Sequence, residues 1–354
     1  MSKKSEPMSS EPMSSGTVTS PSVSAVSSGP GASPRGGLRL PSDHLWLVIV
    51  WVAMLSVPFV APNNYIVSLV NLGLINLILI ASLNLLMGYG GQISLSHAGF
   101  FGHGAYVSGI LSAKFGITPW LGLPAAAIIA GLAALVVGLP TLRLKGHYLS
   151  MATLGWNAIL VVLFNQLVDL TGGPNGLLGV KPFSIGSIRL SSEIYAFPLV
   201  WIVSFLVMLA ILNLIRSRLG RALRAVATNE LGADAVGIDS FRTKLLFFVV
   251  SAGIAGIAGS LYVHINQYAS PETFGVSYSI LFIVMVAIGG SGTYWGPVLG
   301  ALIYTLLPQI LLDYEDMELL FFGVGMLVVL IVFPGGLAGI PRAIAGLARK
   351  GAAK

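Results

Sequence analysis

One element of the chain resembles the surroundings of a nucleophilic serine. Ser291 lies in the tetrapeptide Gly-Gly-Ser-Gly at 289–292, which matches a G-x-S-G element. A nucleophilic serine needs a base within hydrogen-bond reach. No histidine follows Ser291, and His264 is predicted at the opposite face of the membrane, so only His97 or His103 could supply that base. The match is a weak signal in a chain with 43 glycines, and an intramembrane serine protease is therefore a less favoured alternative.

Metal and nucleotide chemistry have even less support. His97 and His103 are six positions apart with no acidic residue near them, so we interpret them as polar loop or cavity-lining residues rather than metal ligands. The chain has no cysteine, which excludes cysteine metal sites. It also has no G-x-x-x-x-G-K-[ST] phosphate-binding loop, so it does not itself hydrolyse ATP. No catalytic residue, metal or cofactor is predicted.

The composition predicts that the remaining polar residues lie on or between membrane-spanning helices. The chain has 354 residues, of which 55% are hydrophobic and 9% charged, against about 25% charged in an ordinary soluble domain. This composition excludes a soluble globular protein. From Leu45 onward, apolar stretches are long enough to cross the bilayer as helices. Ten spans are predicted, near 45–61, 66–87, 98–113, 119–139, 148–168, 196–215, 245–263, 277–290, 296–312 and 317–333. The expected fold class is all-α, a polytopic integral membrane protein.

Polar and small residues within these spans are candidates for a translocation path. A polar stripe in hydrocarbon faces protein or a cavity, and the second span carries such a stripe. Glycines that follow this span, and those at 289–292, could support broken helices whose backbone lines a cavity, although close helix packing is the favoured interpretation of the glycines. The candidate path residues are Asn71, Asn76, Asn84, Gly88, Gly91, Gln92 and Asn157. Glycines at 253, 256 and 259 predict a close-packing face on the seventh span.

Basic residues in the connecting loops predict the orientation. If the N-terminus is cytoplasmic, 16 of the 19 Lys and Arg residues fall in inner segments, and only Lys114, Lys181 and Arg189 fall outside. This is the bias of cytoplasmic loops. Both termini should therefore be cytoplasmic, and the net charge of +6 reflects topology rather than binding to nucleic acid.

The middle of the predicted bilayer carries no carboxylate or ammonium group. All 13 acidic residues fall in loops, tails or span edges. Proton- and sodium-coupled carriers usually retain such groups within the membrane, although unwound helices can bind sodium with carbonyls alone. A secondary, ion-coupled transporter is therefore a second alternative.

The inner segment 216–244 carries nine of the chain's 32 charges. Its first part places Leu219, Leu223 and Val226 at i, i+4 and i+7 beside a basic stripe, which predicts a short amphipathic helix over 216–227. Segments of this kind dock into grooves on partner proteins. A basic loop lying on anionic lipid is the alternative.

A second short helix should follow in the same segment. Asn229 can cap it, with Glu230 in its first turn and Gly237 just beyond its end. Leu231, Ala235 and Ile238 repeat the apolar spacing. The residues predicted to contact a soluble partner are Arg221, Arg224, Asn229, Glu230, Asp234, Gly237 and Ile238.

Five segments resemble permeases of ABC importers of the branched-chain amino acid type, the LivM group. They are 138–155 (GLPTLRLKGHYLSMATLG), 171–177 (TGGPNGL), 220–248 (GRALRAVATNELGADAVGIDSFRTKLLFF), 288–301 (IGGSGTYWGPVLGA) and 333–340 (FPGGLAGI). The resemblance runs from about Val67 to Ile340. It implies a permease domain over 45–340, with 216–244 as the loop that couples it to ATPase subunits. The resemblance does not cover the N-terminal tail at 1–44, where the Ser- and Pro-rich composition predicts disorder. A basic tail is expected at 341–354.

The resemblance also implies partners and a location. The partners would be a second homologous permease, two cytoplasmic ATP-binding subunits, an extracytoplasmic solute-binding protein and the lipid of a bacterial-type inner membrane. Many family members carry a Glu and a basic residue where this chain has Ala158 and Val161. The resemblance implies branched-chain or other hydrophobic amino acids as the first expectation for the solute, and this departure from the family pattern keeps urea, amides and aromatic acids as alternatives.

Overall fold

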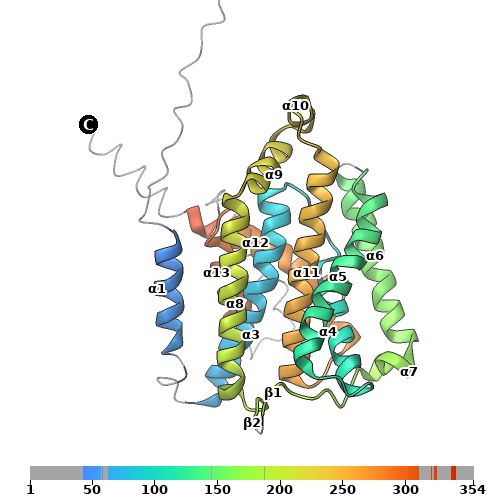
Figure 1. The fold of residues 1–354 in the computed structure, drawn as a ribbon, viewed down its shortest axis with the longest axis vertical. Coiled ribbons are helices and arrows are strands. Elements are labelled where there is room, and N and C mark those ends of the chain that lie inside the picture. The colour runs from blue at the N-terminus through green and yellow to red at the C-terminus, as the bar shows by residue number, and fades with distance from the viewer. Residues whose placement is uncertain are drawn as a thin grey trace, which may run out of the picture. The chain divides into compact units, whose positions relative to one another are not determined.

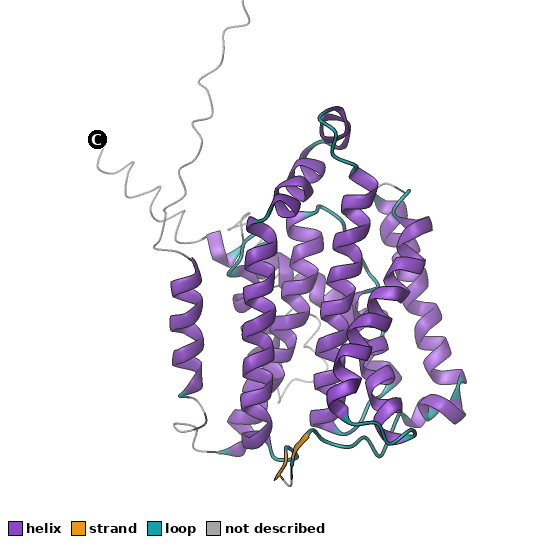
Figure 2. Ribbon diagram, viewed as in Figure 1, coloured by secondary structure: helices purple, strands orange, loops and turns teal. Residues whose placement is uncertain are grey.

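The structure is a computed structural model that describes residues 43–56, 58, 63–144, 146–186, 188–310, 320, 323–324 and 336–339. The chain divides into Met1–Asp43 and a unit of His44–Lys354. The described helices lie in the second unit, with α1 beginning at its boundary. Helices dominate this unit (Figures 1 and 2), and the only strands in the described ranges are an antiparallel pair of two residues each. The predicted all-α class is confirmed.

The described elements follow one another in this order: α1 Asp43–Leu55, α3 Asn64–Asn84, the π-helical turn Leu85–Tyr89, α4 His97–Ala113, α5 Pro119–Thr141, α6 His147–Gln166, α7 Val168–Thr171, β1 Ser184–Ile185, β2 Ile188–Arg189, α8 Glu193–Arg216, α9 Arg218–Thr228, α10 Glu230–Ala235, α11 Ser240–Asn266, α12 Val276–Gly289 and α13 Gly296–Ile310. Short 3₁₀ turns stand at Gly173–Asn175, Pro271–Phe274 and Leu337–Gly339.

Five stretches of helix are long and apolar enough to cross a membrane. They are Asn64–Tyr89, Pro119–Thr141, His147–Gln166, Glu193–Arg216 and Ser240–Asn266. Four other predicted spans contain shorter helices, α1, α4, α12 and α13, of 13 to 17 residues. The predicted tenth span, the tails and most of the sequence after Ile310 lie outside the described residues, so the count of ten spans remains a prediction.

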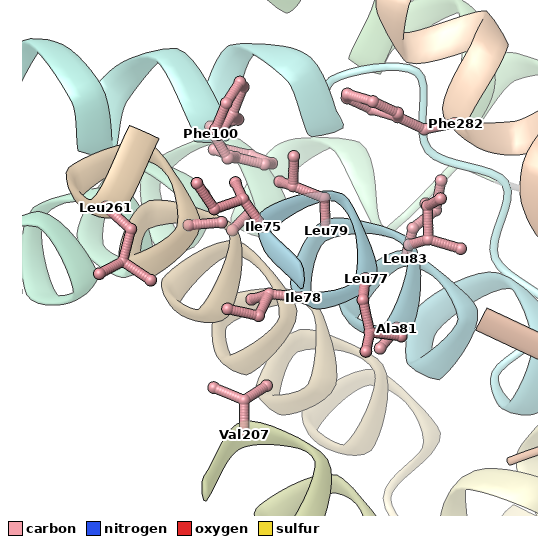
Figure 3. Close-up of a cluster of buried hydrophobic side chains, with 14 of the residues drawn as sticks. Ile75, Leu77, Ile78, Leu79, Ala81, Leu83, Phe100, Val207, Leu261 and Phe282 are labelled. Carbon is pink, nitrogen blue, oxygen red and sulfur yellow. The ribbon is translucent and has the colours of Figure 1, made fainter. Parts of the chain in front are cut away.

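Helix α3 forms the centre of the core. It packs against α8, α11, α12 and α13, and its Ile78, Leu79 and Leu83 have no exposed surface. Figure 3 shows these side chains between Phe100 of α4, Leu261 of α11 and Phe282 of α12. Every residue from Leu74 to Leu86 is buried, and α3 is therefore held by protein along most of its length.

Helix α11 fits closely between α4 and α5. A Cβ atom at Gly256 would lie 2.6 Å from the Ala126 carbonyl oxygen of α5, and one at Gly259 would clash with the Phe101 carbonyl oxygen of α4. Only glycine allows backbones to approach this closely. The close-packing face predicted on the seventh span is confirmed.

The bundle has two distinct ends. Helices α9 and α10 lie at one end, and α7 with the β1–β2 hairpin lies at the other (Figure 1). Leu144 and His147 share a cavity with Ala227 of α9, which places the α5–α6 connection at the end that holds α9 and α10. At the opposite end, Trp120 donates a hydrogen bond to the Ser184 carbonyl of β1.

Candidate functional site

Residues 217–237 fold into two short capped helices, α9 and α10. The Ser217 hydroxyl accepts a hydrogen bond from Gly220 N at the start of α9, and the Asn229 side chain accepts one from Gly232 N at 3.1 Å at the start of α10. Gly237 follows α10 with a φ of 83°, a backbone conformation that favours glycine. The two predicted helices are confirmed, but α9 begins at Arg218 rather than 216 because Ser217 breaks away from α8 to cap it.

Two arginines tie α9 to the end of α8. Arg224 Nη2 donates to the Ile215 carbonyl at 3.1 Å, and Arg221 Nη1 donates to the Arg216 carbonyl at 3.1 Å. The last carbonyls of a helix have no partner within it and carry partial negative charge. These two guanidinium groups therefore hold α9 in a fixed direction relative to α8. Arg218, the other arginine of the basic stripe on α9, forms neither of these two hydrogen bonds.

Helix α10 is tied in turn to α11. Glu230 forms an ion pair with Lys244, and Ser240 N donates to Asp234 Oδ1 at 3.1 Å. Lys244 is only 13% exposed, because the first residues of α11 pack beneath α10. Residues 240–244, predicted as loop, are helical, since Asp239 caps α11 by accepting from Arg242 N at 2.9 Å.

The tip of this segment presents apolar side chains to solvent. Leu231 is 78% exposed and Val236 is 76% exposed. Leu231 belongs to the predicted apolar face, but Val236 does not fit its i, i+4, i+7 spacing, because α10 ends at Ala235 and the chain then turns. In α9, Leu223 and Val226 are buried within the chain rather than presented to a partner, whereas Leu219, in the first turn of the same helix face, is 47% exposed.

The two glycine-rich breaks meet inside the bundle. Asn84 Nδ2 donates to the Thr293 carbonyl at 2.8 Å, and Gly292 N donates to Asn84 Oδ1 at 2.9 Å. Gly88 lies so close to Gly292 that a Cβ atom at Gly88 would clash with the Gly292 amide nitrogen. The turn between α12 and α13 is thus fixed to the end of α3 by one side chain and one backbone contact.

The other asparagines predicted for the path bond to neighbouring helices. Asn71 Nδ2 donates to the Glu193 carbonyl at 3.0 Å, and Asn76 Nδ2 donates to Thr305 Oγ1 at 3.2 Å. Asn157 of α6 is fully buried, and its Nδ2 lies 3.4 Å from Ser279 Oγ of α12. Within this one chain, these polar groups join helices to one another.

The histidines required by the protease hypothesis have other partners. His97 Nε2 lies 2.6 Å from Ser82 Oγ, and both side chains are fully buried. His103 Nδ1 lies 3.0 Å from the Gly99 carbonyl oxygen. Ser291 lies in the exposed turn after α12, so the structure does not bring these groups together as a nucleophile and its base.

A cavity of about 180 Å³ opens at the end of the bundle that holds α9 and α10. Two of the predicted path residues, Gly91 and Gln92, line it, as do His147 and Ser150 of α6 and the Glu230–Lys244 pair. Gln92 is 4% exposed, and neither of its amide atoms has a hydrogen-bond partner. Sequence reasoning did not foresee that α6 and α10 meet beside Gln92, because the three segments are far apart in the chain.

Long apolar helices joined by buried polar groups define an α-helical membrane protein. Residues 65–330 match the family model described as branched-chain amino acid transport system / permease component. The chain belongs to this family and is a non-catalytic permease subunit.

Several curated relatives have the same description. The chain is 30% identical over 335 residues to the high-affinity branched-chain amino acid transport system permease protein LivM of Escherichia coli K12, covering 88% of this chain and 78% of that protein. It is 30% identical over 284 residues to the LivH permease of Salmonella typhimurium, covering 72% of this chain and 89% of that protein. A probable LivM of Methanocaldococcus jannaschii is 29% identical over 233 residues, or 60% of this chain and 67% of the relative. No solved structure matches the chain.

Proposed function

We propose that this permease is the membrane subunit of an ATP-driven importer and that α9 and α10 transmit the work of two cytoplasmic ATP-binding subunits. The observation that carries this proposal is the two-sided attachment of the segment 217–239. Arg221 and Arg224 fix it to α8, and Glu230 and Asp234 fix it to α11. A push on the exposed tip would therefore move two long helices together rather than bend a loop.

The chemistry of the tip suits a protein groove better than a lipid surface. Leu231 and Val236 supply exposed apolar contact, and Glu230, Asp234 and Asp239 interrupt the positive charge. Anionic lipid would favour an unbroken basic face. Asn229, Gly237 and Ile238 complete the proposed contact by setting the start and the end of α10.

The charge distribution supports a cytoplasmic location for this end of the bundle. Arg143, four arginines between 216 and 224, Arg242 and Lys244 lie in or beside the connections at this end, whereas Lys181 and Arg189 lie with the β1–β2 hairpin at the other. This is the cytoplasmic bias of short loops. We therefore propose cytoplasmic termini, a bacterial-type inner membrane, and contact with a solute-binding protein at the hairpin end.

The proposed solutes are branched-chain or other hydrophobic amino acids, because the relatives named above are permeases of branched-chain amino acid systems. A second homologous permease is proposed as partner, since both LivM and LivH relatives exist in Escherichia coli K12. The translocation path remains a proposal that includes the seven predicted residues, with Gly91 and Gln92 nearest its inner end.

The proposed coupling role is tested with the double variant Glu230→Lys, Gly237→Arg in the assembled transporter. It removes the ion pair with Lys244 and strains the turn after α10. We expect loss of co-purifying ATP-binding subunits and of ATP-driven leucine uptake. Glu272→Lys adds the same charge change on the exposed 3₁₀ turn before α12 and should leave retention of those subunits unchanged. Unchanged association and uptake in the double variant would refute the coupling role.

A separate measurement addresses ion coupling. Uptake is followed after an uncoupler has collapsed the proton gradient while ATP is maintained. Persisting uptake is expected, whereas uptake that survives deletion of the ATP-binding subunits would favour the secondary transporter instead.

A further inference from the structure

We propose that His264 is a positioning residue for energy coupling, which joins the surface at the hairpin end of the permease to helix α11. This surface is the hairpin-end segment, residues 177–185, where Leu178 is 67% exposed and Ile185 is 61% exposed. The inference rests on the proposed function, because that function places a solute-binding protein at this end and ATP-binding subunits at the other. Through His264, one helix would connect both contacts.

His264 holds the hairpin-end segment through a chain of buried hydrogen bonds. Its Nδ1 lies 2.7 Å from the Lys181 carbonyl oxygen, and a carbonyl can only accept, so this nitrogen carries a proton. In the neutral imidazole Nε2 is then an acceptor. It lies 2.7 Å from Ser108 Oγ of α4, which in turn lies 2.8 Å from Ser260 Oγ. The donors therefore point in one direction along this chain, which ends on the backbone of the hairpin-end segment.

The same segment is fixed at further points to α4 and α5. Lys181 N donates to Ser112 Oγ of α4 at 3.3 Å. The buried Phe183 ring packs edge-on against His264, with centroids 4.8 Å apart, and against Trp120 of α5, with centroids 5.2 Å apart. A force on the exposed side chains of the segment would therefore reach three helices through backbone and buried contacts rather than bend a free loop.

Helix α11 continues from His264 to α10 at the other end of the bundle. Ser240 and His264 lie about 36 Å apart along this helix, at about 1.5 Å per residue, and no proline interrupts it. At its inner end, Ser240 N donates to Asp234 Oδ1, and Lys244 pairs with Glu230. One unbroken helix therefore connects the hairpin-end segment with the helix that is proposed to meet the ATP-binding subunits.

Close packing supports α11 between these two ends. Gly256 and Gly259 lie against backbone carbonyls of α5 and α4, and Ser251 Oγ donates to the Ser82 carbonyl of α3 at 2.6 Å. Interiors packed in this way have low compressibility and transmit strain. A displacement of the hairpin-end segment would therefore reach α10 through α11 rather than be absorbed along the way.

The Ser108–His264 pair also has the spacing of a serine nucleophile and its base. Both side chains are fully buried, so a substrate cannot reach the hydroxyl group. Because each nitrogen of the ring already has a partner within the chain, the geometry supports positioning rather than catalysis.

The test uses the full transporter, with its second permease and ATP-binding subunits, in lipid nanodiscs. ATP hydrolysis is measured against the concentration of its solute-binding protein loaded with L-leucine, which gives a basal rate, a maximum rate and a half-saturating concentration. For His264→Leu we expect the maximum stimulated rate to fall about fivefold, the effect of one lost hydrogen bond. The basal rate and the half-saturating concentration should not change. Asn266→Leu should match the parent, because Asn266 is exposed and its side chain bonds to the Tyr262 carbonyl of the same helix.

Two polar variants separate the bond to Lys181 from the bond to Ser108. His264→Asn keeps an N–H group near the position of Nδ1 and can still donate to the Lys181 carbonyl, so we expect it to retain most of the stimulation. His264→Gln keeps its amide near the position of Nε2 and loses the bond to the hairpin-end segment, so we expect it to resemble His264→Leu. His264→Gln also carries the test if the apolar variant does not fold, as judged by size-exclusion elution.

Parent-like maximum stimulation in His264→Gln overturns the inference, as does stimulation in His264→Asn that is as low as in His264→Gln. A higher half-saturating concentration with an unchanged maximum would show that His264 only shapes the contact surface. An equal fall in the basal rate would show a merely structural role, and either result overturns transmission through α11.

A parent transporter whose ATP hydrolysis does not respond to the binding protein also overturns the inference. In that case co-purification of the ATP-binding subunits still supports the proposed role of α9 and α10. Conversely, retention of those subunits by the Glu230→Lys, Gly237→Arg variant counts against that role alone, because the His264 variants leave α9 and α10 unchanged.

Discussion

The side chain of Asn84 accepts a hydrogen bond from the backbone nitrogen of Gly292 at 2.9 Å and returns one to the adjacent Thr293 carbonyl at 2.8 Å. These residues are more than 200 positions apart. One amide thus satisfies a donor and an acceptor of the half-buried turn between α12 and α13. Asn84, predicted as a path residue, also holds two broken helices together.

Replacing Asn84 with Leu should destabilise the protein. The substitution removes the two hydrogen bonds to Gly292 N and the Thr293 carbonyl, each of which contributes about 1 kcal/mol to stability. We expect the thermal unfolding midpoint of the detergent-solubilised protein to fall. Asn266→Leu is the control, because Asn266 is exposed and bonds only to the Tyr262 carbonyl of its own helix. Equal thermal unfolding midpoints for the two variants would contradict a stabilising role of the Asn84 hydrogen bonds to Gly292 and Thr293.

Gly88→Ala should also be destabilising, for a steric reason. The added methyl group would clash with the Gly292 backbone and with Asn84 Oδ1, and overpacking of this kind costs about 1–3 kcal/mol. Gly155→Ala is the matched control on α6, where a Cβ atom meets nothing within 4 Å and alanine favours the helix. The prediction fails if Gly88→Ala unfolds at or above the temperature of Gly155→Ala.

A charge exchange distinguishes two roles of Glu230. The single variants Glu230→Lys and Lys244→Glu should both reduce ATP-driven uptake, since each places like charges beside one another at the joint between α10 and α11. The double exchange restores the pair. If Glu230 acts by positioning α10, uptake recovers in the double variant; if it instead contacts the ATP-binding subunit, uptake stays low. We expect recovery, with little change in stability, because a partly exposed pair contributes about 1 kcal/mol or less.

Ser291→Ala should leave uptake near the level of the parent. The serine side chain lies in an exposed turn, and His97 and His103 hydrogen-bond to Ser82 and Gly99. Uptake assays of the purified transporter provide the measurement, with Asn84→Leu as a variant in the same region that we expect to lose activity. Loss of all activity in Ser291→Ala would instead support Ser291 as the nucleophile of a serine protease.

Much of the fold could be predicted from local pattern. The long apolar stretches corresponding to α3, α5, α6, α8 and α11 are recognisable because each residue in hydrocarbon must be apolar and each backbone group must bond within its own helix. The caps at Asn229 and Gly237 are local as well, since a cap depends on neighbours within a few positions. The limits of α9 and α11 shifted because Ser217 and Asp239, rather than the apolar pattern, set their first turns.

The features of the candidate site also separate into those visible in the sequence and those that need the tertiary structure. The sequence by itself determined the membrane class, the family and the position of the two short capped helices α9 and α10, because hydropathy, charge and short motifs are properties of neighbouring residues. Only the tertiary structure decided that Asn84 bonds to Gly292, that Arg221 and Arg224 bond to the end of α8, and that Gln92, the start of α6 and Glu230 line one cavity. Such contacts join segments far apart in the chain, and their partners are selected by how the helices pack in three dimensions, for which spacing along the sequence carries no signal.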